Sequence, residues 1–525
     1  MEPMTPGDMP THEALCPAIL RSGETCWRLA PTSRFSVIVD AADYFAAARD
    51  AMLQAEHAIY LIGWDFDLRI KLVPEASDNV PCELGSFLKY LVKRKPHLRI
   101  HILKWDMAVL YSAGSQTLPI LGADFHSFGR IHMRFDSQHP WTAAHHQKVV
   151  VIDDSLAFCG GIDMTVDRWD TRAHLPHDNR RRRPDGKLCC PWHDATAVLD
   201  GRAARALADL CRARWKAATG QRLPAMGGHR RLWPESIEPQ LRDVQVGIAR
   251  TMPAFDGRPA VHEIETLYLA AIRAARRTIY LESQYFASAS LCAAIAERLG
   301  EPDGPEVIVV NPLSMKGWLE EHTMESERDM RLAAVARADR HGRFGIFYPV
   351  DAAEDPIYVH AKILVVDDRL LRIGSSNVNN RSMGFDTECD LAIEPQRSDQ
   401  QETIAAIRDD LLAEHLDTEP ETVRQAIATE SSVLRAIHRL RQDRGRSLRP
   451  LHTNRVNALE EIVTNAQLAD PERPERVETI LTHLAKRVVL RVPPAAWALA
   501  AVVVTGTAYA MSRRHYLHHH REQER

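Results

Sequence analysis

Residues 146–153 read HQKVVVID and residues 360–367 read HAKILVVD, so one octet, His-x-Lys-x-x-x-x-Asp, occurs twice in the chain. A turn of small residues follows each copy at the same offset, GGID at 160–163 and GSSN at 374–377. The period is far longer than the roughly 20–50 residues of repeat arrays, so the pattern indicates a duplicated domain. Two lysines and two histidines that meet around one substrate would favour an anion.

An apolar run with aromatic residues precedes each octet and extends the duplication. IYLIGWDFD begins at Ile59 and IYLESQYF begins at Ile279, in the same order relative to the octets. Helical periodicity over 40–57 and 261–276 leads into these two runs. Strands that alternate with helices predict an α/β layer architecture.

Length and composition limit the class of protein. A chain of 525 residues exceeds what one hydrophobic core usually serves, so two or three domains are expected. A net charge of −4 gives no global basic field of the kind that marks a general nucleic-acid binder. The nine cysteines lack the spacing of a metal site or a disulfide framework, which favours a reducing compartment. The N-terminus has no basic-then-apolar pattern, so no secretory signal is predicted.

The domain boundaries follow from changes in composition. The Gly/Pro-containing stretch 220–240 is the best candidate for the connection between lobes. We expect an irregular leader over 1–34, a first lobe over 35–225, a second lobe over 240–397 and a polar helical segment over 398–488.

The C-terminal region contains an uncharged stretch, VPPAAWALAAVVVTGTAYAM at 492–511. A helix of about 20 residues spans about 30 Å, the thickness of a bilayer's hydrocarbon core. Basic residues flank the stretch on both sides, which leaves its orientation open. We expect a transmembrane helix here, with a buried or amphipathic helix as the alternative.

The octets place their polar residues on defined faces if each forms a strand. Alternate strand residues share a face, so His146 and Lys148 would point the same way, as would His360 and Lys362. The octet-ending carboxylates would face the other way and anchor the following turn; these are Asp153 and Asp367. The turns would bring backbone and small side chains close to the site, namely Gly160, Gly161, Gly374, Ser375 and the side-chain donor Asn377.

Histidine chemistry suits a phosphodiester. One imidazole can attack phosphorus while the other, protonated, supplies a proton to the leaving alkoxide. Lys148, Lys362 and Asn377 would bind the phosphoryl oxygens, so no metal or other cofactor is expected. Each histidine needs a carboxylate to orient it, and Asp194 and Glu388 occupy similar positions at the start of strand-like runs.

These motifs resemble those of the phospholipase D superfamily. The segments HHQKVVVIDDSLAFCGGIDMTVDRWD, PWHD and GSSNVNNRSMGFDTECD are closest to the phosphatidylcholine-type phospholipases D. The resemblance covers roughly residues 35–395. It implies an α/β fold of two similar α-β-α sandwich lobes with pseudo-twofold symmetry and one active site between them, with the helical segment following.

The resemblance also implies roles for the residues. His146 and His360 become the catalytic pair, with His146 as the expected nucleophile, although the sequence symmetry does not decide between them. Asp194 and Glu388 support the two histidines. Asp163 stands where the second copy has Asn377, and we expect it to face away from the phosphate or to serve packing, because an ionised carboxylate would repel the substrate.

The expected activity is hydrolysis of glycerophospholipids to phosphatidic acid and a head-group alcohol, with transphosphatidylation, through a phosphohistidine. The alternatives are a cardiolipin-type phospholipid synthase, a nuclease of the same superfamily and an inactive membrane scaffold. We expect a monomer that binds a membrane surface but no nucleic acid, anchored by its C-terminal helix with the lobes in the cytoplasm. The basic loop at 180–183 is a second candidate for lipid contact.

Overall fold

The computed structural model describes residues 18–106, 129–227, 231–314 and 318–452, with 318–324 described by their backbone alone. These residues all belong to one compact unit, Met1–Glu472. The second unit, Arg473–Arg525, lies outside the described residues, and so does the expected membrane helix at 492–511. Among the helices of the described ranges, none combines the length and apolar character needed to cross a bilayer.

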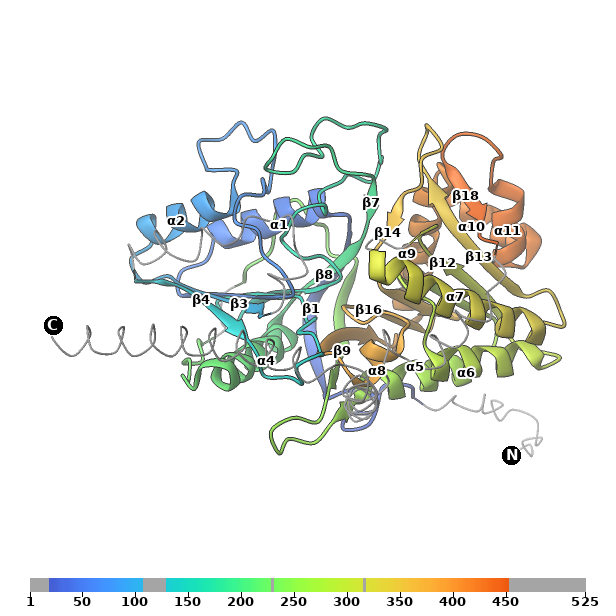
Figure 1. Ribbon diagram of the computed structural model, residues 1–525, viewed down its shortest axis with the longest axis horizontal. Coiled ribbons are helices and arrows are strands. Elements are labelled where there is room, and N and C mark those ends of the chain that lie inside the picture. Colours follow the sequence, from blue (N-terminus) through green and yellow to red (C-terminus); the bar gives the residue numbers. More distant parts are fainter. Residues whose placement is uncertain (1–17, 107–128, 228–230, 315–317, 453–525) are drawn as a thin grey trace, which may run out of the picture. The chain divides into compact units, whose positions relative to one another are not determined.

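One large mixed sheet of 16 strands forms the centre of the fold (Figure 1). From the middle outward, the first half contains β1 (Arg28–Val39), β8 (Ala195–Asp200), β6 (Leu156–Gly160), β5 (Val149–Ile152), β2 (Ala58–Gly63), β3 (Arg99–Trp105) and β4 (Ile131–Asp136). The second half contains β9 (Leu241–Met252), β17 (Glu388–Ile393), β16 (Leu370–Gly374), β15 (Ile363–Val366), β11 (Thr278–Glu282), β12 (Glu306–Val310), β13 (Phe344–Val350) and β18 (Ser447–Pro450). In addition, β10 (Val261–His262) pairs with β9.

The two halves repeat the same strand pairing. In the first half four antiparallel pairs, from β1 to β2, are followed by two parallel pairs to β4. In the second half the run from β9 to β13 has the same sequence of directions. Antiparallel pairing of β1 with β9 joins them, so the duplication seen in the sequence is present in the topology as one continuous sheet.

Helices cover both faces of each half. The first half has α1 (Ala41–Leu53), α2 (Leu84–Arg94) and α4 (Gly201–Thr219); the second has α5 (Glu263–Ala274), α6 (Ala289–Gly300), α7 (Trp318–Ala338), α8 (Asn380–Gly384), α9 (Ser398–Leu416), α10 (Pro420–Glu430) and α11 (Val433–Leu440). Ile59 packs in the core beneath α1 and α2, whereas its neighbour Tyr60 packs on the opposite face with α4. Ile279 and Tyr280 divide in the same way between α5–α6 and α9. Alternation along a strand buried on both faces produces this three-layer arrangement.

The structure differs from the expected boundaries at two places. Strand β1 begins at Arg28, inside the stretch expected to be an irregular leader, because its first residues pair with β9. The stretch after 398 is not a polar helical cover throughout. Helix α9 buries Ile404 and Leu411 in the central core, and Ser447–Pro450 pairs with β13 as an edge strand. Hydrophobic burial and strand pairing are tertiary effects that the polar composition of this stretch did not indicate.

A second, two-stranded sheet links the halves. Strand β7 (Trp192–His193) pairs in parallel with β14 (Tyr358–Val359), and Figure 1 shows them side by side between the helices of the two halves. The second octet directly follows β14, and His360 N donates a hydrogen bond to His193 O at 2.7 Å. The chain therefore places the second histidine next to the first half's PWHD segment.

Candidate active site

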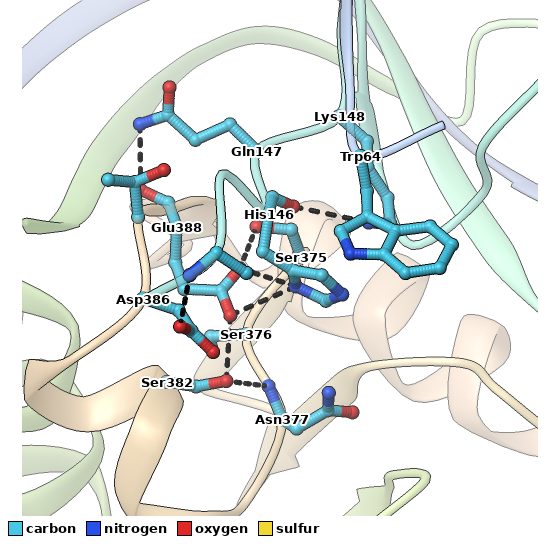
Figure 2. Close-up of polar contacts among 12 residues, drawn as sticks. Trp64, His146, Gln147, Lys148, Ser375, Ser376, Asn377, Ser382, Asp386 and Glu388 are labelled. Atoms are coloured by element: carbon cyan, nitrogen blue, oxygen red, sulfur yellow. Dashed lines mark hydrogen bonds and ion pairs between the residues drawn. The ribbon is translucent and has the colours of Figure 1, made fainter. Parts of the chain in front are cut away.

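The two octet histidines are each hydrogen-bonded to a carboxylate from the opposite half. His146 Nδ1 lies 2.9 Å from Glu388 Oε2 and 3.0 Å from Oε1 (Figure 2). His360 Nδ1 lies 2.6 Å from Asp194 Oδ2. The four residues come from distant parts of the sequence, and each pair is completed only when both halves fold together.

The sequence pattern predicted that the octet histidines lie within strands, and this prediction was wrong. Strand β5 begins at Val149 and β15 at Ile363, so each His-x-Lys precedes its strand. The reason is a change of backbone partner. His146 N donates to Thr387 O at 2.9 Å, in the other half, before the chain enters its own ladder. Both histidines therefore sit on segments that connect the two halves.

Glu388 is held by two hydroxyl groups as well as by His146. Ser375 Oγ donates to Glu388 Oε2 at 2.5 Å, and Ser382 Oγ donates to Oε1 at 2.7 Å (Figure 2). Burial raises the pKa of Glu388 to about 8, although both serine hydrogen bonds oppose the rise. The carboxyl group is fixed in orientation, and its ionisation is sensitive to charge placed nearby.

Asp194 occupies the corresponding place beside His360. Its Oδ1 accepts a hydrogen bond from Ala195 N at 2.8 Å, which leaves Oδ2 for the imidazole. Burial raises the pKa of Asp194 to about 7, and the charge of Lys362 opposes that rise. Both carboxyl groups are thus buried, and burial is the main cause of the raised pKa of each.

The two lysines are buried, and each donates from Nζ to the backbone oxygen of its octet histidine, at 3.2 Å from Lys148 to His146. Lys148 Nζ forms an ion pair with Asp163 Oδ2 at 3.0 Å. Asp163 was expected to face away from the phosphate or to serve packing. Its carboxylate instead points toward Lys148, which is 4% exposed, and balances the charge of that lysine. Lys362 Nζ donates to His360 O, and burial lowers its pKa to about 7.

Asn377 takes the place of Asp163 in the second half without making an ion pair. Its backbone N donates to Ser382 Oγ at 3.0 Å, which fixes the residue in the turn after β16 (Figure 2). Its side chain is 4% exposed, and Oδ1 has no hydrogen-bond partner among the described residues. Buried polar atoms usually have partners, so this amide has unused capacity to bind a ligand.

The turn glycines are required by close packing against acidic side chains. A Cβ atom on Gly161 would clash with Asp194 Oδ1, and one on Gly374 would clash with the side chain and Cα of Asp390. Gly160 similarly faces Thr196. Of these glycines, Gly161 lies against the candidate site, and a methyl group there would displace the carboxylate that is hydrogen-bonded to His360.

The octet-ending aspartates anchor the neighbouring strand instead of the turn that follows them. Asp153 accepts hydrogen bonds from the backbone N–H groups of residues 56–58, at 2.8 Å each. Asp367 does the same for residues 276–278, at 2.7–2.8 Å. Both aspartates adopt a left-handed backbone conformation, with φ of 50° and 53°. Each thus fixes the start of β2 or β11 relative to its octet.

Sequence reasoning missed one cation of the site. The Arg168 guanidinium carbon lies 4.3 Å from the centroid of the Trp192 ring, whose own centroid is 5.1 Å from that of His360. After burial and Lys362, Arg168 is the next cause that lowers the pKa of His360. The available signal was the basic residue in the RWD triplet after GGID, which has no counterpart in the second copy.

The electrostatics favour neutral imidazoles when no anion is bound. Burial, followed by the charges of Lys148 and Lys362, lowers the pKa of His146 well below its usual value. Burial and Lys362 do the same to His360. A neutral imidazole that donates Nδ1–H to a carboxylate keeps its Nε2 lone pair for attack on an electrophile. An anion between the lysines would raise both histidine pKa values.

The arginines of the 180–183 loop are engaged within the loop region. Arg181 is buried and pairs with Asp170 at 2.9 Å, and Arg183 pairs with Asp167. Arg180 pairs with Asp178 at 2.7 Å. Arg182 is exposed and donates to Asn179 and to the backbone oxygen of Gly186, so these contacts hold the loop together while its contact with lipid stays a prediction.

Some buried side chains of the described residues could hold a metal ion, but the two octet histidines are not among them. Among the described residues, the sets of histidines and carboxylates close enough to hold an ion all include His193, and none includes His146 or His360.

Parts of the chain are similar in sequence to known proteins. Residues 350–460, which contain the second octet, match the family model Phospholipase D. Phospholipase D A of Dictyostelium discoideum is 24% identical over 417 residues, covering 67% of this chain and 32% of that protein. Phospholipase D alpha 4 of Arabidopsis thaliana is 24% identical over 479 residues, covering 70% of this chain and 62% of that protein. The chain thus spans less than two thirds of the length of these relatives.

The fold is also similar to a solved structure. The crystal structure of phosphatidylserine synthase from Haemophilus influenzae superposes with a TM-score of 0.52 at 14% identity, covering 88% of this chain and 96% of that one. At this identity the similarity concerns the fold alone. The comparisons thus show similarity in sequence to phospholipases D and similarity in fold, a large mixed α/β sheet, to this synthase.

Proposed function

We propose that the chain cleaves glycerophospholipids between the phosphate and the head-group alcohol, as a phospholipase D that also transfers the phosphatidyl group to alcohols. The observation that carries the proposal is the crossed arrangement of His146 with Glu388 and His360 with Asp194. Two oriented imidazoles next to two lysines supply a nucleophile, an acid and an anion site within one enclosure.

In the first step, His146 Nε2 attacks phosphorus and the bond from phosphorus to the head-group oxygen breaks. His360 gives its Nε2 proton to the departing alkoxide, so a phosphatidyl-histidine and a free alcohol form. Glu388 stabilises the positive charge that develops on His146. We assign the nucleophile to His146 because its side chain is 17% exposed, whereas that of His360 is 6% exposed.

In the second step, neutral His360 takes a proton from water as the water oxygen attacks phosphorus. The bond from phosphorus to His146 Nε2 breaks, which releases phosphatidic acid and restores both histidines. A primary alcohol in place of water gives a phosphatidylalcohol by the same route. Binding of the phosphate anion is what protonates His360 beforehand, since its charge offsets the effect of Lys362 on the imidazole pKa.

The phosphate would lie between the two half-sites. Lys362, whose depressed pKa rises when an anion approaches, supplies the second half's charged donor. The Nδ2 group of the buried Asn377 would supply a second donor. Lys148 supplies the first half's charge, moderated by Asp163. This unequal division supports one defined orientation of the substrate, with the two sides of the phosphorus in different environments.

An exposed aromatic residue supports a lipid substrate. Trp141 is 74% exposed and lies five residues before His146 in the sequence. Tryptophan favours the interface between water and lipid because its ring is apolar and its N–H is polar. We further propose that residues 492–511 anchor the protein in the membrane, with the catalytic part in the cytoplasm, as a monomer without a nucleic-acid partner. Release of a chain truncated at residue 490 from membranes would test the anchor.

The test of activity uses phosphatidylcholine vesicles with a primary alcohol. We expect release of choline and formation of phosphatidylalcohol, measured by mass spectrometry, and loss of both in His146→Ala. The same assay run with phosphatidylglycerol as acceptor, and a parallel assay with DNA, distinguish a synthase and a nuclease. Absence of any phospholipid turnover by folded wild-type protein would contradict the proposal.

A further inference from the structure

A second group of buried polar residues includes His193 of β7, which directly precedes Asp194, but contains neither octet histidine. Asp40, His174, His193 and Glu414 each offer one ligand atom, and these atoms all lie within 4.8 Å of one another. The four side chains are between 0% and 2% exposed. Asp40 and the histidines come from the first half and Glu414 comes from α9, so the group joins the two halves.

The spacing of the four ligand atoms suits a small divalent cation. Glu414 Oε1 lies 2.9 Å from His193 Nδ1 and 3.2 Å from His174 Nε2. The oxygens of Asp40 lie 3.3 Å from His174 Nε2 and 3.5 Å from His193 Nδ1. Tetrahedral zinc with ligands at about 2.0–2.2 Å separates its donor atoms by roughly 3.3–3.5 Å.

The outer ring nitrogens of both histidines are already held by other carboxylates. His174 Nδ1 lies 2.9 Å from Asp170 Oδ2, and His193 Nε2 lies 2.8 Å from Glu282 Oε2. Metal-binding histidines almost always donate their second N–H to such a group, which fixes the tautomer and directs the lone pair at the ion. The two imidazoles thus present Nε2 and Nδ1, respectively, to the centre of the group.

One oxygen of the group has no hydrogen bond. Asp40 Oδ2 is fully buried and accepts none from the described residues; its nearest cationic neighbour is His174 Nε2, at 3.3 Å. A buried carboxylate oxygen without a donor is costly, by about 1–3 kcal/mol or more. A cation at the centre would satisfy it.

The charges around the group also match a dication. Arg172 pairs with Glu414 and Arg181 pairs with Asp170, both at hydrogen-bonding distance. Arg172 also pairs with Asp410 at 2.9 Å, so with neutral histidines the carboxylates around the group, Asp40 and Glu282 among them, outnumber the arginines. Protonated histidines would donate hydrogen bonds to Glu414 from their inner nitrogens, whereas neutral histidines could bind one ion of charge +2. The second arrangement also gives a partner to Asp40 Oδ2.

We propose that Asp40, His174, His193 and Glu414 bind one zinc ion that locks the two halves together behind the active site. Two imidazoles with two carboxylates suit zinc better than calcium or magnesium, which prefer oxygen alone. The site is structural. His193 precedes Asp194 and accepts the backbone N–H of His360 at 2.7 Å, so the ion fixes β7 and the catalytic pair that adjoins it. It takes no part in the phosphoryl transfer.

The test is the metal content of the full chain, purified without a histidine tag and dialysed against metal-free buffer. We expect about one equivalent of zinc in the wild type and its loss in His174→Gln and Asp40→Asn. His146→Ala, which changes only the catalytic pair, should retain the metal. Because the tail carries its own HHH at 518–520, the difference between variants is the quantity that counts.

A second measurement covers variants that fail to fold. Cobalt(II) bound to wild-type protein at the proposed site would give the intense visible absorption of a four-coordinate ion. A zinc chelator would lower the Tm of wild type but would not alter the Tm of folded His174→Gln. Folded wild type that contains less than a tenth of an equivalent of zinc, and binds neither added zinc nor cobalt(II), overturns the proposal. Equal metal content in wild type and folded His174→Gln overturns it as well.

Discussion

His146 Nδ1 and Glu388 Oε2 lie 2.9 Å apart although 242 residues separate them in the chain. The histidine belongs to the first half of the sheet and the glutamate begins β17 in the second. His360 and Asp194 make the reciprocal contact. Each octet histidine takes its carboxylate partner from the opposite half, so the proposed chemistry requires both halves to be folded and joined.

Replacing either catalytic histidine should abolish turnover. We expect His146→Ala and His360→Ala each to lower kcat by about 10³-fold or more, and the double variant to be no worse, because the two residues act in one reaction cycle. Rates of choline release by the three variants provide the measurement. If either single variant keeps a tenth of wild-type activity, the two-histidine mechanism is wrong.

Glu388→Gln should lower kcat with little change in KM. The amide keeps the size of the side chain but cannot stabilise the charge that develops on His146, and the expected loss is about 10²- to 10⁴-fold. Asp399→Asn, in an exposed ion pair with Arg397, is the matched control and should leave both constants unchanged. A main effect on KM would indicate that Glu388 acts in substrate binding.

The same Glu388→Gln variant should become more stable relative to wild type as the pH rises from about 5 to 8. Burial raises the pKa of Glu388 in the folded protein to about 8, above its unfolded value. The stability that comes from its protonated form is therefore complete below the unfolded pKa and is lost as the pH rises through this window. Glutamine does not titrate, so the difference in unfolding free energy changes by up to about 1.4 kcal/mol per pH unit.

Urea unfolding at several pH values gives this difference directly. The depressed pKa of Lys362 has the opposite effect above pH 7, but it is present in both proteins and largely cancels. A difference that stays constant between pH 5 and 8 would mean that Glu388 ionises at its ordinary pKa.

Asp163→Asn should destabilise the protein. The change leaves Lys148 buried without its ion-pair partner at 3.0 Å, and removal of one partner from a buried pair costs about 3–5 kcal/mol. Chemical denaturation compares this variant with Asp399→Asn, whose pair with Arg397 is exposed and should contribute nothing measurable. Equal stability of the two variants would show that Lys148 does not need a charged partner.

Trp141→Ala should weaken action on vesicles more than on monomeric lipids. The ring takes no part in the hydrogen bonds between the octet histidines and their carboxylates, so the chemical step should be retained. We expect a fall of about tenfold in kcat/KM on vesicles and less than twofold on a short-chain phospholipid below its micelle concentration, since interfacial tryptophan contributes about 1 kcal/mol or more. Leu29→Ala, also at an exposed apolar residue, is the control on β1. Equal losses on both substrates would exclude an interfacial role.

The repeated elements were predictable because their signals are local. The octets and the runs from Ile59 and Ile279 follow strand patterns, and the structure places β2 and β11 at those runs with equivalent partners. Apart from Arg168, the side chains discussed in the candidate site were also predictable by type. The ion pair of Asp163 with Lys148 was not predicted, because the sequence shows a carboxylate near a phosphate site but does not show which lysine lies beside it.

The sequence by itself determined the duplicated α/β plan and the residue types of the candidate site, because strand periodicity and motif spacing are properties of short segments. Only the tertiary structure decided which carboxylate serves which histidine, where Arg168 lies, and that His174, His193, Asp40 and Glu414 converge behind β7. These contacts join residues far apart in the chain, and they depend on the antiparallel pairing of β1 with β9, which places the two halves against each other in a single register.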